Sequence, residues 1–437
     1  MSNPVAGASA AIPQKRWVYV IPVAAIMYML AYLDRNNVAV ILPFIDQDGG
    51  MTLSVADKGL VTGIFFVGYM VLQIPGAVLA QKWSAKKTVL ILMILWGLAA
   101  ISCGLVNTRG QFLVARFFLG VFEGGVWPAV LVLLASWFPL KERARANALW
   151  MACLPISSVI MAPLSGILLD FFSWRAVLMI EGVPPLVWAV VWWFAMSDNP
   201  AQARWVSAAE RAHVESALAE DEAAKPYVNP KGGYRRALRN SRVWLLILIY
   251  FCWMSGFYGF SLWLPTVLKE LTGGSPTLVG WLTAIPFGLA LGSMIMVSRW
   301  SDTRQDRRLA VAVPLLVGAG ALVAGQFVHT PAANIVLLCV AAMAIYAPYG
   351  PFWAIPAEFL RIEVLAFSMG LINALGNLGG FLGPYAVGYL KEATGSDLIG
   401  YLFLAGLLAL AALVTLRALR TGATAPSEPV ATDSVTS

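Results

Sequence analysis

The sequence is poor in charge, in histidine and in cysteine. Charged residues make up 12% of the 437 residues and hydrophobic residues 59%, whereas soluble domains carry about 25% charged and about 45–50% apolar residues. This composition excludes a soluble domain and favours a chain that crosses a membrane many times. The 4 cysteines stand singly in apolar runs, and the 2 histidines stand apart from them, so neither a disulfide framework nor a zinc site is indicated. We expect no cofactor, no metal site and no nucleic-acid partner.

Long apolar runs fill most of the chain. A membrane-spanning helix needs about 20 largely apolar residues, and such windows predict an all-α membrane protein with twelve transmembrane helices. We expect two pseudo-symmetric six-helix bundles at 17–196 and 242–418, with cytoplasmic segments at 1–16, 197–241 and 419–437. The predicted spans are 17–45, 57–80, 88–106, 111–138, 145–169, 175–196, 243–268, 277–298, 309–329, 332–356, 364–390 and 397–418.

Lysine and arginine are distributed unevenly between the two sides of these spans. With the N-terminus inside, 23 of the 30 Lys and Arg residues fall on inner segments and 5 on outer ones. Cytoplasmic loops carry such an excess, so both termini are predicted to lie on the cytoplasmic side of the cell (inner) membrane. The first apolar run is longer than a signal-peptide core of about 7–15 residues, so we expect it to stay in the mature protein. We expect 197–241 to be a solvated linker with one short amphipathic helix, and 419–437 to be unstructured.

Four ionisable side chains lie inside the predicted spans: Asp34 and Arg35 in the first, and Arg116 and Glu123 in the fourth. Each costs about 2.5–3.5 kcal/mol at mid-membrane on insertion scales, so they should pair with one another or line a wet cavity. Arg116 and Glu123 are two helical turns apart and share one face, whereas Asp34 and Arg35 diverge by about 100°. Buried ionisable groups in membranes are functional by default, and the alternative is a purely structural ion-pair network.

These four charges suit the coupling of a proton to an organic anion. Two cations and two carboxylates cancel when all are ionised, so an anion drawn to an arginine must compete with the carboxylates. Protonation of one carboxyl group releases an arginine and leaves the site net positive. We therefore predict that Arg35 and Arg116 bind the anion, and that Glu123 takes the proton with Asp34 as its partner or rival.

Weaker candidates recur at a spacing of four residues, which places each pair on one face of a helix. Helix–helix hydrogen bonding or packing explains each pair as well as substrate contact does. Together, amides and aromatic rings would suit a hydroxylated or aromatic carboxylate. The candidate substrate ligands of this kind are Tyr69, Gln73, Asn373, Asn377 and, paired with Tyr349, Trp353.

Over residues 17–418 the chain resembles the Major Facilitator Superfamily, and within it the anion:cation symporter family. YLDRNNVAV (32–40) resembles that family's signature in the first span, and RFFLGVFEGGVWP (116–128) followed by WFPLKERARA (137–146) resembles its fourth span and loop. NALGNLGGFLGPYAVGYLKEATG (373–395) resembles its eleventh span. The resemblance implies a site between two bundles, with proton and anion binding at Asp34, Arg35, Arg116 and Glu123, and a substrate-contacting tyrosine at Tyr69.

The superfamily's gate motif is altered in the first half and kept in the second. GAVLAQKWSAKK (76–87) carries Gln81 where the general pattern has an acid, whereas SRWSDTRQDRR (298–308) keeps an acid followed by basic residues. The resemblance implies that Asp302, with Arg307 and Arg308, supports a cytoplasmic gate by meeting a helix N-terminus of the other half.

The favoured function is proton-coupled uptake of a small organic anion by alternating access, in a protein that we expect to be monomeric. The alternative is a proton-coupled antiporter that exports drugs or metabolites, although two arginines inside the membrane argue against it. A membrane-embedded enzyme would need a nucleophile and base or metal ligands inside the spans, and no span holds a histidine suited to that. Sugar acids, hydroxy acids and aromatic acids all stay open as the anion.

Overall fold

The computed structural model describes residues 14–48, 51–223, 236–304, 306–328, 330–360 and 362–418. Within these ranges the chain is helical and contains no strand, so the predicted all-α class is confirmed. Most of the expected N-terminal tail, part of the central loop (224–235) and the tail 419–437 lie outside the described residues.

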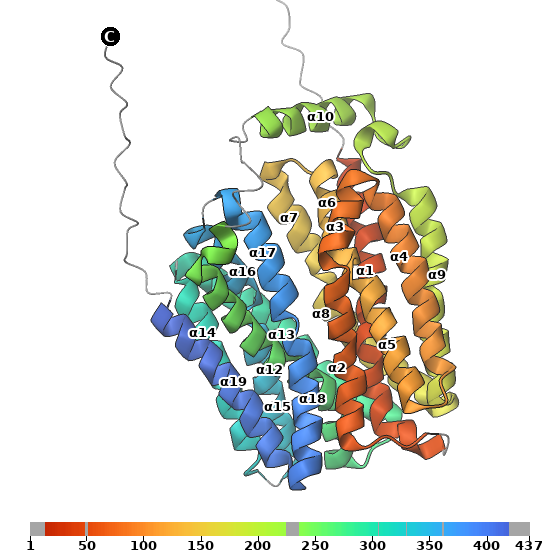
Figure 1. Cartoon of the computed structure of the whole chain (residues 1–437), viewed down its shortest axis with the longest axis vertical. Coiled ribbons are helices and arrows are strands. Elements are labelled where there is room, and N and C mark those ends of the chain that lie inside the picture. Colours follow the sequence, from red (N-terminus) through yellow and green to blue (C-terminus); the bar gives the residue numbers. More distant parts are fainter. Residues whose placement is uncertain are drawn as a thin grey trace, which may run out of the picture.

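The helices of the first half run side by side in Figure 1, from α1 in red to α9 in yellow-green. Several predicted spans are built from two helices, because glycine or proline near their middle interrupts the backbone hydrogen bonds. The helices are α1 (Lys15–Ile41), α2 (Val55–Val71), α3 (Gln73–Lys82), α4 (Ala85–Gly104), α5 (Arg109–Gly124), α6 (Val126–Trp137), α7 (Leu140–Met151), α8 (Cys153–Phe171) and α9 (Trp174–Ala195).

The helices of the second half form a matching set, drawn from green to blue on the other side of Figure 1. Their bounds are α12 (Ser241–Thr272), α13 (Pro276–Arg304), α14 (Arg307–Gly325), α15 (Pro331–Tyr346), α16 (Tyr349–Phe359), α17 (Ile362–Gly376), α18 (Gly379–Thr394) and α19 (Asp397–Ala418).

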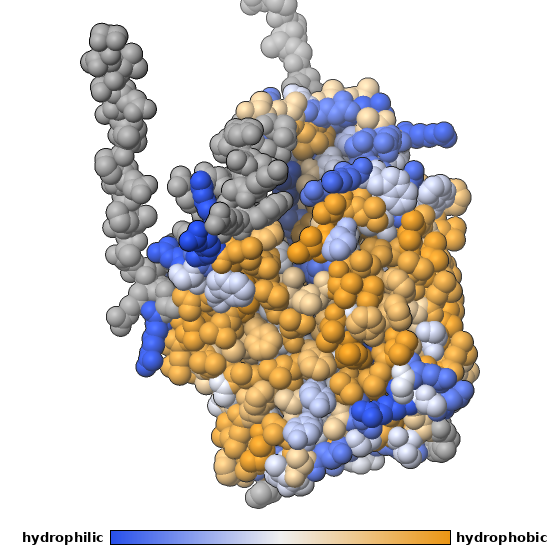
Figure 2. All heavy atoms as spheres, viewed as in Figure 1, coloured by the Kyte–Doolittle hydropathy of each residue, from blue (hydrophilic) through white to orange (hydrophobic). Residues whose placement is uncertain are grey.

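The described residues hold 11 helical segments that are long and apolar enough to cross a membrane. They coincide with eleven of the twelve predicted spans. The predicted span 364–390 is built from α17 (15 residues) and α18 (16 residues), which meet at Asn377 and Leu378. The count of twelve therefore stays a prediction. Figure 2 shows the apolar surface as a broad belt around the middle of the visible face, with hydrophilic residues toward both ends.

Most contacts between the two halves are made by two pairs of helices, α2 with α18 and α8 with α13. The contacts lie toward the end of the bundle where α2 and α13 begin, which we call the far face. The opposite end, where α1 begins and α19 ends, is the termini face. A Cβ atom on Gly59 would lie 2.5 Å from the Pro384 carbonyl oxygen, and one on Gly166 would lie 2.4 Å from that of Pro276. Main chain therefore meets main chain at the far face.

The central loop differs in part from the solvated linker predicted from its charge. Its helix α10 (Ala208–Ala223) lies across the termini face of the first half (Figure 1). Arg16 donates to Glu210 at 3.0 Å and to Glu142 at 2.7 Å, and the Arg16 and Glu210 side chains are buried. The Trp205 ring, in the turn before α10, stacks on Trp137 with 5.2 Å between centroids. Buried ionic and aromatic contacts therefore fix the first part of the loop to the first half.

Candidate functional site

The four predicted charges and Tyr69 lie together in the first half, and all five side chains are buried. Asp34 and Arg35 come from α1, Arg116 and Glu123 from α5, and Tyr69 from α2. Gly120 and Gly124 bring α5 directly against α2, since a Cβ atom on either would lie 2.0 Å from a carbonyl oxygen of α2. Small residues permit this close approach of helices in membranes.

An ion pair joins the first span to the fourth. Arg35 Nη2 lies 3.1 Å from Glu123 Oε2, and Arg35 Nε lies 3.4 Å from the same oxygen. The other oxygen, Glu123 Oε1, is buried and has no hydrogen-bond partner in the part of the chain that the structure describes. The Arg35 guanidinium also lies over the Tyr69 ring, 4.6 Å from its centroid. Glu123 thus holds a cation with one oxygen and leaves the other open to a proton.

The Arg116 guanidinium is engaged by the main chain. Its Nη1 donates to the Asp34 carbonyl oxygen at 3.1 Å, and its Nη2 donates to the Arg35 carbonyl oxygen at 3.2 Å. A weaker contact of 3.5 Å joins its Nε to the Val61 carbonyl oxygen. Arg116 and Glu123 share a face of α5 as predicted, but Glu123 pairs with Arg35. In this arrangement Arg116 holds the stretch of α1 that carries Asp34 and Arg35.

Asp34 faces away from the arginine that follows it. Its Oδ2 accepts a hydrogen bond from Trp96 Nε1 of α4 at 3.1 Å, while Oδ1 is buried without a partner among the described residues. As predicted, Asp34 and Arg35 point in different directions. The Asp34 carboxyl group lies against α4, and the Arg35 guanidinium lies against Glu123.

The Arg35 side of the cluster reaches the boundary between the halves. The Arg35 guanidinium lies over the Phe65 ring of α2, 5.2 Å from its centroid, and the Phe65 ring packs on that of Phe66. The Phe66 ring in turn packs against Tyr258 of α12 with 4.2 Å between centroids. Aromatic rings therefore connect the charges to the second half.

The predicted amide residues form a chain across the same boundary. Asn373 Nδ2 donates to Gln73 Oε1 at 3.2 Å, and Asn377 Nδ2 donates to Asn373 Oδ1 at 2.9 Å. Gln73 Nε2 is buried and finds no partner within the described residues. Trp353 lies in the adjacent aromatic group of the second half, with its ring centroid 5.1 Å from that of Tyr250. The structure thus brings α3 and α17 together through their amide side chains.

The predicted gate residues lie away from this cluster, at the termini face. Asp302 lies in the last turn of α13 and pairs with Arg307 of α14, which also donates to Ser301 Oγ at 3.0 Å. Arg308 Nη1 donates to the Leu416 carbonyl oxygen at 3.4 Å. These contacts join helices of the second half.

Glu181 is a buried acid that the sequence analysis missed. It lies within the predicted span 175–196, so counting only four ionisable side chains inside the spans was wrong. Its side chain is 2% exposed on α9, and Ser165 Oγ of α8 donates to its Oε1 at 2.5 Å. A check of each predicted span for single carboxyl groups would have found it, because Glu181 has no neighbouring charge in the sequence.

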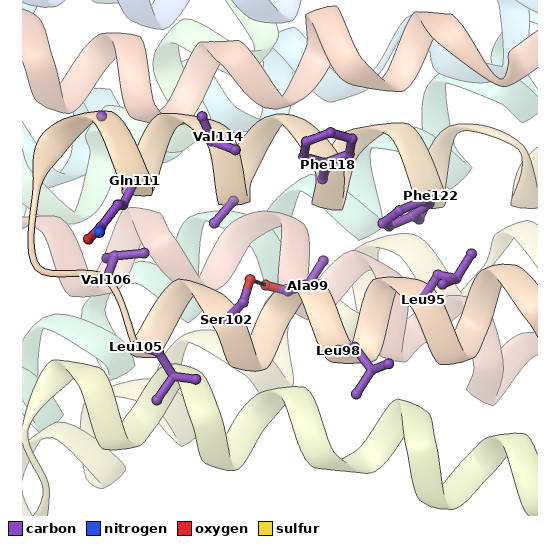
Figure 3. Close-up of a pocket in the computed structure, with 12 residues that line it drawn as sticks. Leu95, Leu98, Ala99, Ser102, Leu105, Val106, Gln111, Val114, Phe118 and Phe122 are labelled. Carbon is purple, nitrogen blue, oxygen red and sulfur yellow. Dashed lines mark hydrogen bonds between the residues drawn. The ribbon is translucent and has the colours of Figure 1, made fainter.

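A groove of about 710 Å³ lies on the outer side of α5, between α4 and α5. Figure 3 shows Val114, Phe118 and Phe122 on α5 and Leu95 and Leu98 on the neighbouring helix α4, with Phe122 and Leu95 facing each other. No charged side chain lines the groove. It lies on the opposite face of α5 from Arg116 and Glu123, so we do not assign the charge cluster to it.

Within the described part of the chain, no group of three or more His, Cys, Asp and Glu side chains is arranged to hold a metal ion. The carboxyl groups of the cluster could bind protons, and its guanidinium groups could bind an anion. Neither process needs a covalent step.

Comparisons with known proteins identify the family of the chain. The family model of the Major Facilitator Superfamily matches residues 24–384. A putative tartrate transporter of Agrobacterium vitis is 32% identical over 408 residues, covering 92% of this chain and 93% of that protein. A quinolone resistance transporter of Acinetobacter baumannii is 31% identical over 395 residues, covering 88% of this chain and 89% of that protein.

A solved structure shares the fold. The crystal structure of a bacterial homolog to the human lysosomal transporter Spinster, in an inward-facing and unoccupied conformation, matches with a TM-score of 0.71. The match covers 92% of this chain and 95% of that chain at 18% sequence identity. At this identity the likeness supports the fold alone.

Proposed function

Because this chain belongs to the Major Facilitator Superfamily, we propose that it takes up a small organic anion together with protons by alternating access. Family membership makes the protein a multi-pass membrane transporter. The coupling to protons and the anionic cargo are the parts that we propose. The observation that carries them is the buried Arg35–Glu123 pair beside the boundary between the halves.

The anion is proposed to take the place of Glu123 on Arg35. While Glu123 is ionised, it occupies the guanidinium, and a second carboxylate would be repelled. A proton on Glu123 removes that competition, and Glu123 Oε1 lacks a partner that would oppose the proton. Arg35 could then hold the anion through a two-pronged guanidinium–carboxylate contact. An outward-facing site would load proton and anion together, and the more alkaline cytoplasm would remove the proton and favour release.

The remaining parts of the anion are proposed to contact aromatic rings and amides. The Tyr69 ring lies against the Arg35 guanidinium, and the Trp353 ring packs against Tyr250 of the second half. Gln73, Asn373 and Asn377 offer amide groups across the boundary. Such a lining would suit a carboxylate that also carries hydroxyl groups or a ring. The relative named a putative tartrate transporter is consistent with a hydroxylated acid.

Further proposals concern the whole chain. Residues 17–196 and 242–418 would form two six-helix domains joined by 197–241, in a monomer of the inner membrane with both termini cytoplasmic. The excess of Lys and Arg on the termini face supports this orientation. Asp302, Arg307 and Arg308 would support the gate on that face, and Asp34 would share proton binding with Glu123.

Export is the second candidate function. The relative named a quinolone resistance transporter favours it, because resistance can follow from removal of a drug. The charge cluster supports uptake more strongly, since an exchanger of protons for drugs needs carboxyl groups but not two buried arginines. The direction of pH-driven transport separates the two functions.

A ligand screen followed by transport tests the proposal. A carboxylate that binds the folded protein raises its apparent stability by RT ln(1 + [L]/Kd), so a thermal-shift screen of tartrate, aldonates, hexuronates, aromatic acids and a quinolone should identify the class. In proteoliposomes, a gradient acidic outside should then drive accumulation of the selected acid, and a protonophore should abolish it. Accumulation independent of the gradient would contradict proton coupling, and expulsion driven by external acid would favour the exporter.

A further inference from the structure

The loop between α3 and α4 differs in charge from its counterpart between α13 and α14. In the second half, Asp302 stands five residues before Arg307, and the two side chains form an ion pair. In the first half, Gln81 stands five residues before Lys86. The neutral amide therefore leaves Lys86 without the acid that Arg307 has. The proposed transport mechanism gives this loop no role.

Three lysines of this loop form what we call the lysine cluster: Lys82 in the last turn of α3, and Lys86 and Lys87 at the start of α4. Within the described part of the chain, no carboxylate forms an ion pair with their ammonium groups. The Lys86 ammonium lies over the Trp193 ring of α9, 4.6 Å from its centroid, and the Lys87 ammonium lies 5.5 Å from that of Trp83. The cluster thus combines positive charges with aromatic rings.

Asp198 is an acid beside the lysine cluster, and both of its oxygens bind other groups. Ser84 Oγ donates to Asp198 Oδ2 at 2.6 Å, and the backbone N–H of Lys86 donates to Oδ1 at 2.8 Å. Its negative charge still offsets one lysine in the electrostatic balance. Three lysines against one aspartate leave a net charge of +2 (3 − 1), which suits a ligand with one or two negative charges.

A stripe of exposed apolar side chains runs along α4 from the lysine cluster. Lys87, Ile91, Ile94 and Leu98 are spaced by four, three and four residues, which places them on one face of the helix. The three apolar members are exposed. At 1.5 Å per residue the stripe is about 17 Å long, which is close to half of the hydrocarbon core of about 30 Å. It therefore spans about one leaflet.

Helix α9 carries a second stripe with the same spacing, made of exposed Val183, Val187, Val190 and Phe194. Helices α4 and α9 pack against each other on the side of the first half that is away from the second half (Figure 1). Trp192 Nε1 of α9 donates to the Lys86 carbonyl oxygen at 3.0 Å, so the end of the second stripe meets the cluster. Two apolar stripes thus run from the lysines into the membrane.

We propose that the lysine cluster binds the headgroup of an anionic phospholipid in the leaflet at the termini face, with the acyl chains along the two stripes. Anionic headgroups attract lysines at the ends of transmembrane helices, and tryptophan rings favour the headgroup level of a bilayer. The lipid phosphate would take the place beside Lys86 that the Asp302 carboxylate takes beside Arg307. The exposed apolar stripes favour a lipid over a soluble anion. This site is separate from the transport site.

Native mass spectrometry of the detergent-solubilised protein tests the site, with phosphatidylglycerol and phosphatidylcholine of identical acyl chains as probes. The wild type should retain phosphatidylglycerol in preference to phosphatidylcholine. Replacing Lys82, Lys86 and Lys87 together by Gln should lower the retention of phosphatidylglycerol at least about fivefold. Retention of phosphatidylcholine should not change. Equal retention of the two lipids by the wild type would overturn the proposal.

A matched control removes three other positive charges from exposed positions at the termini face. The control carries Lys141→Gln, Arg299→Gln and Arg304→Gln. Its net charge equals that of the cluster variant, and it should retain phosphatidylglycerol like the wild type. Equal losses in the two variants would mean that the general positive charge of this face attracts the lipid, and would overturn the specific site.

Gln81→Asp gives a second measurement should the triple variant fail to fold. Restoring an acid in the loop should lower the retention of phosphatidylglycerol, because a carboxylate then competes with the lipid phosphate for the lysines. Gln81→Asn, which adds no charge, should behave like the wild type. Unchanged retention in Gln81→Asp would contradict the role given to the missing acid. Displacement of the lipid by an equal concentration of inorganic phosphate would overturn the lipid site in favour of one for the soluble ion.

Discussion

The two arginines of the buried cluster make different contacts. Arg35 meets Glu123 and the tyrosines at the boundary, whereas Arg116 meets the carbonyl groups of Asp34 and Arg35. We therefore propose that Arg35 receives the anion, and that Arg116 positions the backbone that carries Arg35 and contributes its charge.

Glu123→Gln is expected to separate binding from coupling. The neutral amide imitates the protonated carboxyl group, so Arg35 stays available to the anion at every pH. Binding of the acid selected by thermal shift should be retained within a few fold, and exchange across proteoliposomes should continue. Accumulation driven by a pH gradient should be lost. Undiminished pH-driven accumulation would show that Glu123 is not the coupling group. Asp34 would then be the candidate, and Asp34→Asn would be compared in the same assay.

Arg116→Lys is expected to fail nearly as badly as Arg116→Ala. The guanidinium spans two consecutive carbonyl groups of α1, and an ammonium group cannot reproduce this planar, two-pronged geometry. Affinity for the selected acid, measured by calorimetry, should fall more than about tenfold, which corresponds to about 1.4 kcal/mol. Wild-type affinity in Arg116→Ala would mean that anion binding needs neither the charge of Arg116 nor its hydrogen bonds to α1.

At the scale of helices, we propose that the close approach of α8 and α13 controls opening at the far face. A Cβ atom on Gly280 would lie 2.4 Å from the Ala162 carbonyl oxygen. Since this neighbour belongs to the backbone, it cannot rotate away as a side chain would.

Gly280→Ala is expected to shift the protein toward the state that is open at the far face. Forcing an extra methyl group into a packed contact costs about 1–3 kcal/mol, and separating the helices relieves it. Spin labels at Asn107→Cys and Ala393→Cys, exposed far-face positions in different halves, should report a longer distance. Gly292→Ala lies on the same helix with nothing within 4 Å of the new Cβ, and should leave the distance unchanged. Equal distances in both variants would contradict the control assigned to this contact.

The contact between α10 and the first half is a second feature at this scale. Glu210 accepts from the Arg16 side chain and from the backbone N–H groups of Lys15 and Arg16. Glu210→Gln removes the charge opposite a buried arginine, and losing one partner of a buried pair costs about 3–5 kcal/mol. Amide hydrogen exchange in α10 and in the first turn of α1 should accelerate. Glu215→Gln, at an exposed position of α10, should exchange its amide hydrogens as slowly as the wild type. Equal exchange in the two variants would mean that the Arg16–Glu210 pair does not hold α10 on the first half.

At the scale of the whole molecule, the distribution of Lys and Arg predicts how the bundle sits in the membrane. A fluorescent protein fused after residue 418 should be bright, because it folds in the cytoplasm, and alkaline phosphatase fused there should be inactive. Fusions within the loop after α18, at residue 395, should behave in the opposite way. The reverse pattern would overturn the proposed orientation.

Much of the fold could be predicted from the sequence, because apolar length alone identifies spans. Eleven spans coincide with helices of the structure, and four buried charges were found because a charge inside a long apolar run is conspicuous, although Glu181 was missed. The pairing of Arg35 with Glu123 could not be predicted, since it depends on how α1 and α5 are rotated about their axes. The docking of α10 was also missed, because its partners, Arg16 and Glu142, lie far away in the sequence.

The two contacts between the halves at the far face have a consequence for how the protein senses its surroundings. Glycine against carbonyl carries no formal charge, so these glycine contacts should be insensitive to ionic strength, unlike the neighbouring hydrogen bond from the Ala56 N–H to the Glu392 carboxylate. The glycine contacts depend instead on how closely four helices can approach, which the thickness and lateral tension of the bilayer can alter. The protein would then respond to two physical quantities at different depths. Proton concentration would act at the acid cluster, and bilayer thickness and tension would act at the glycine contacts.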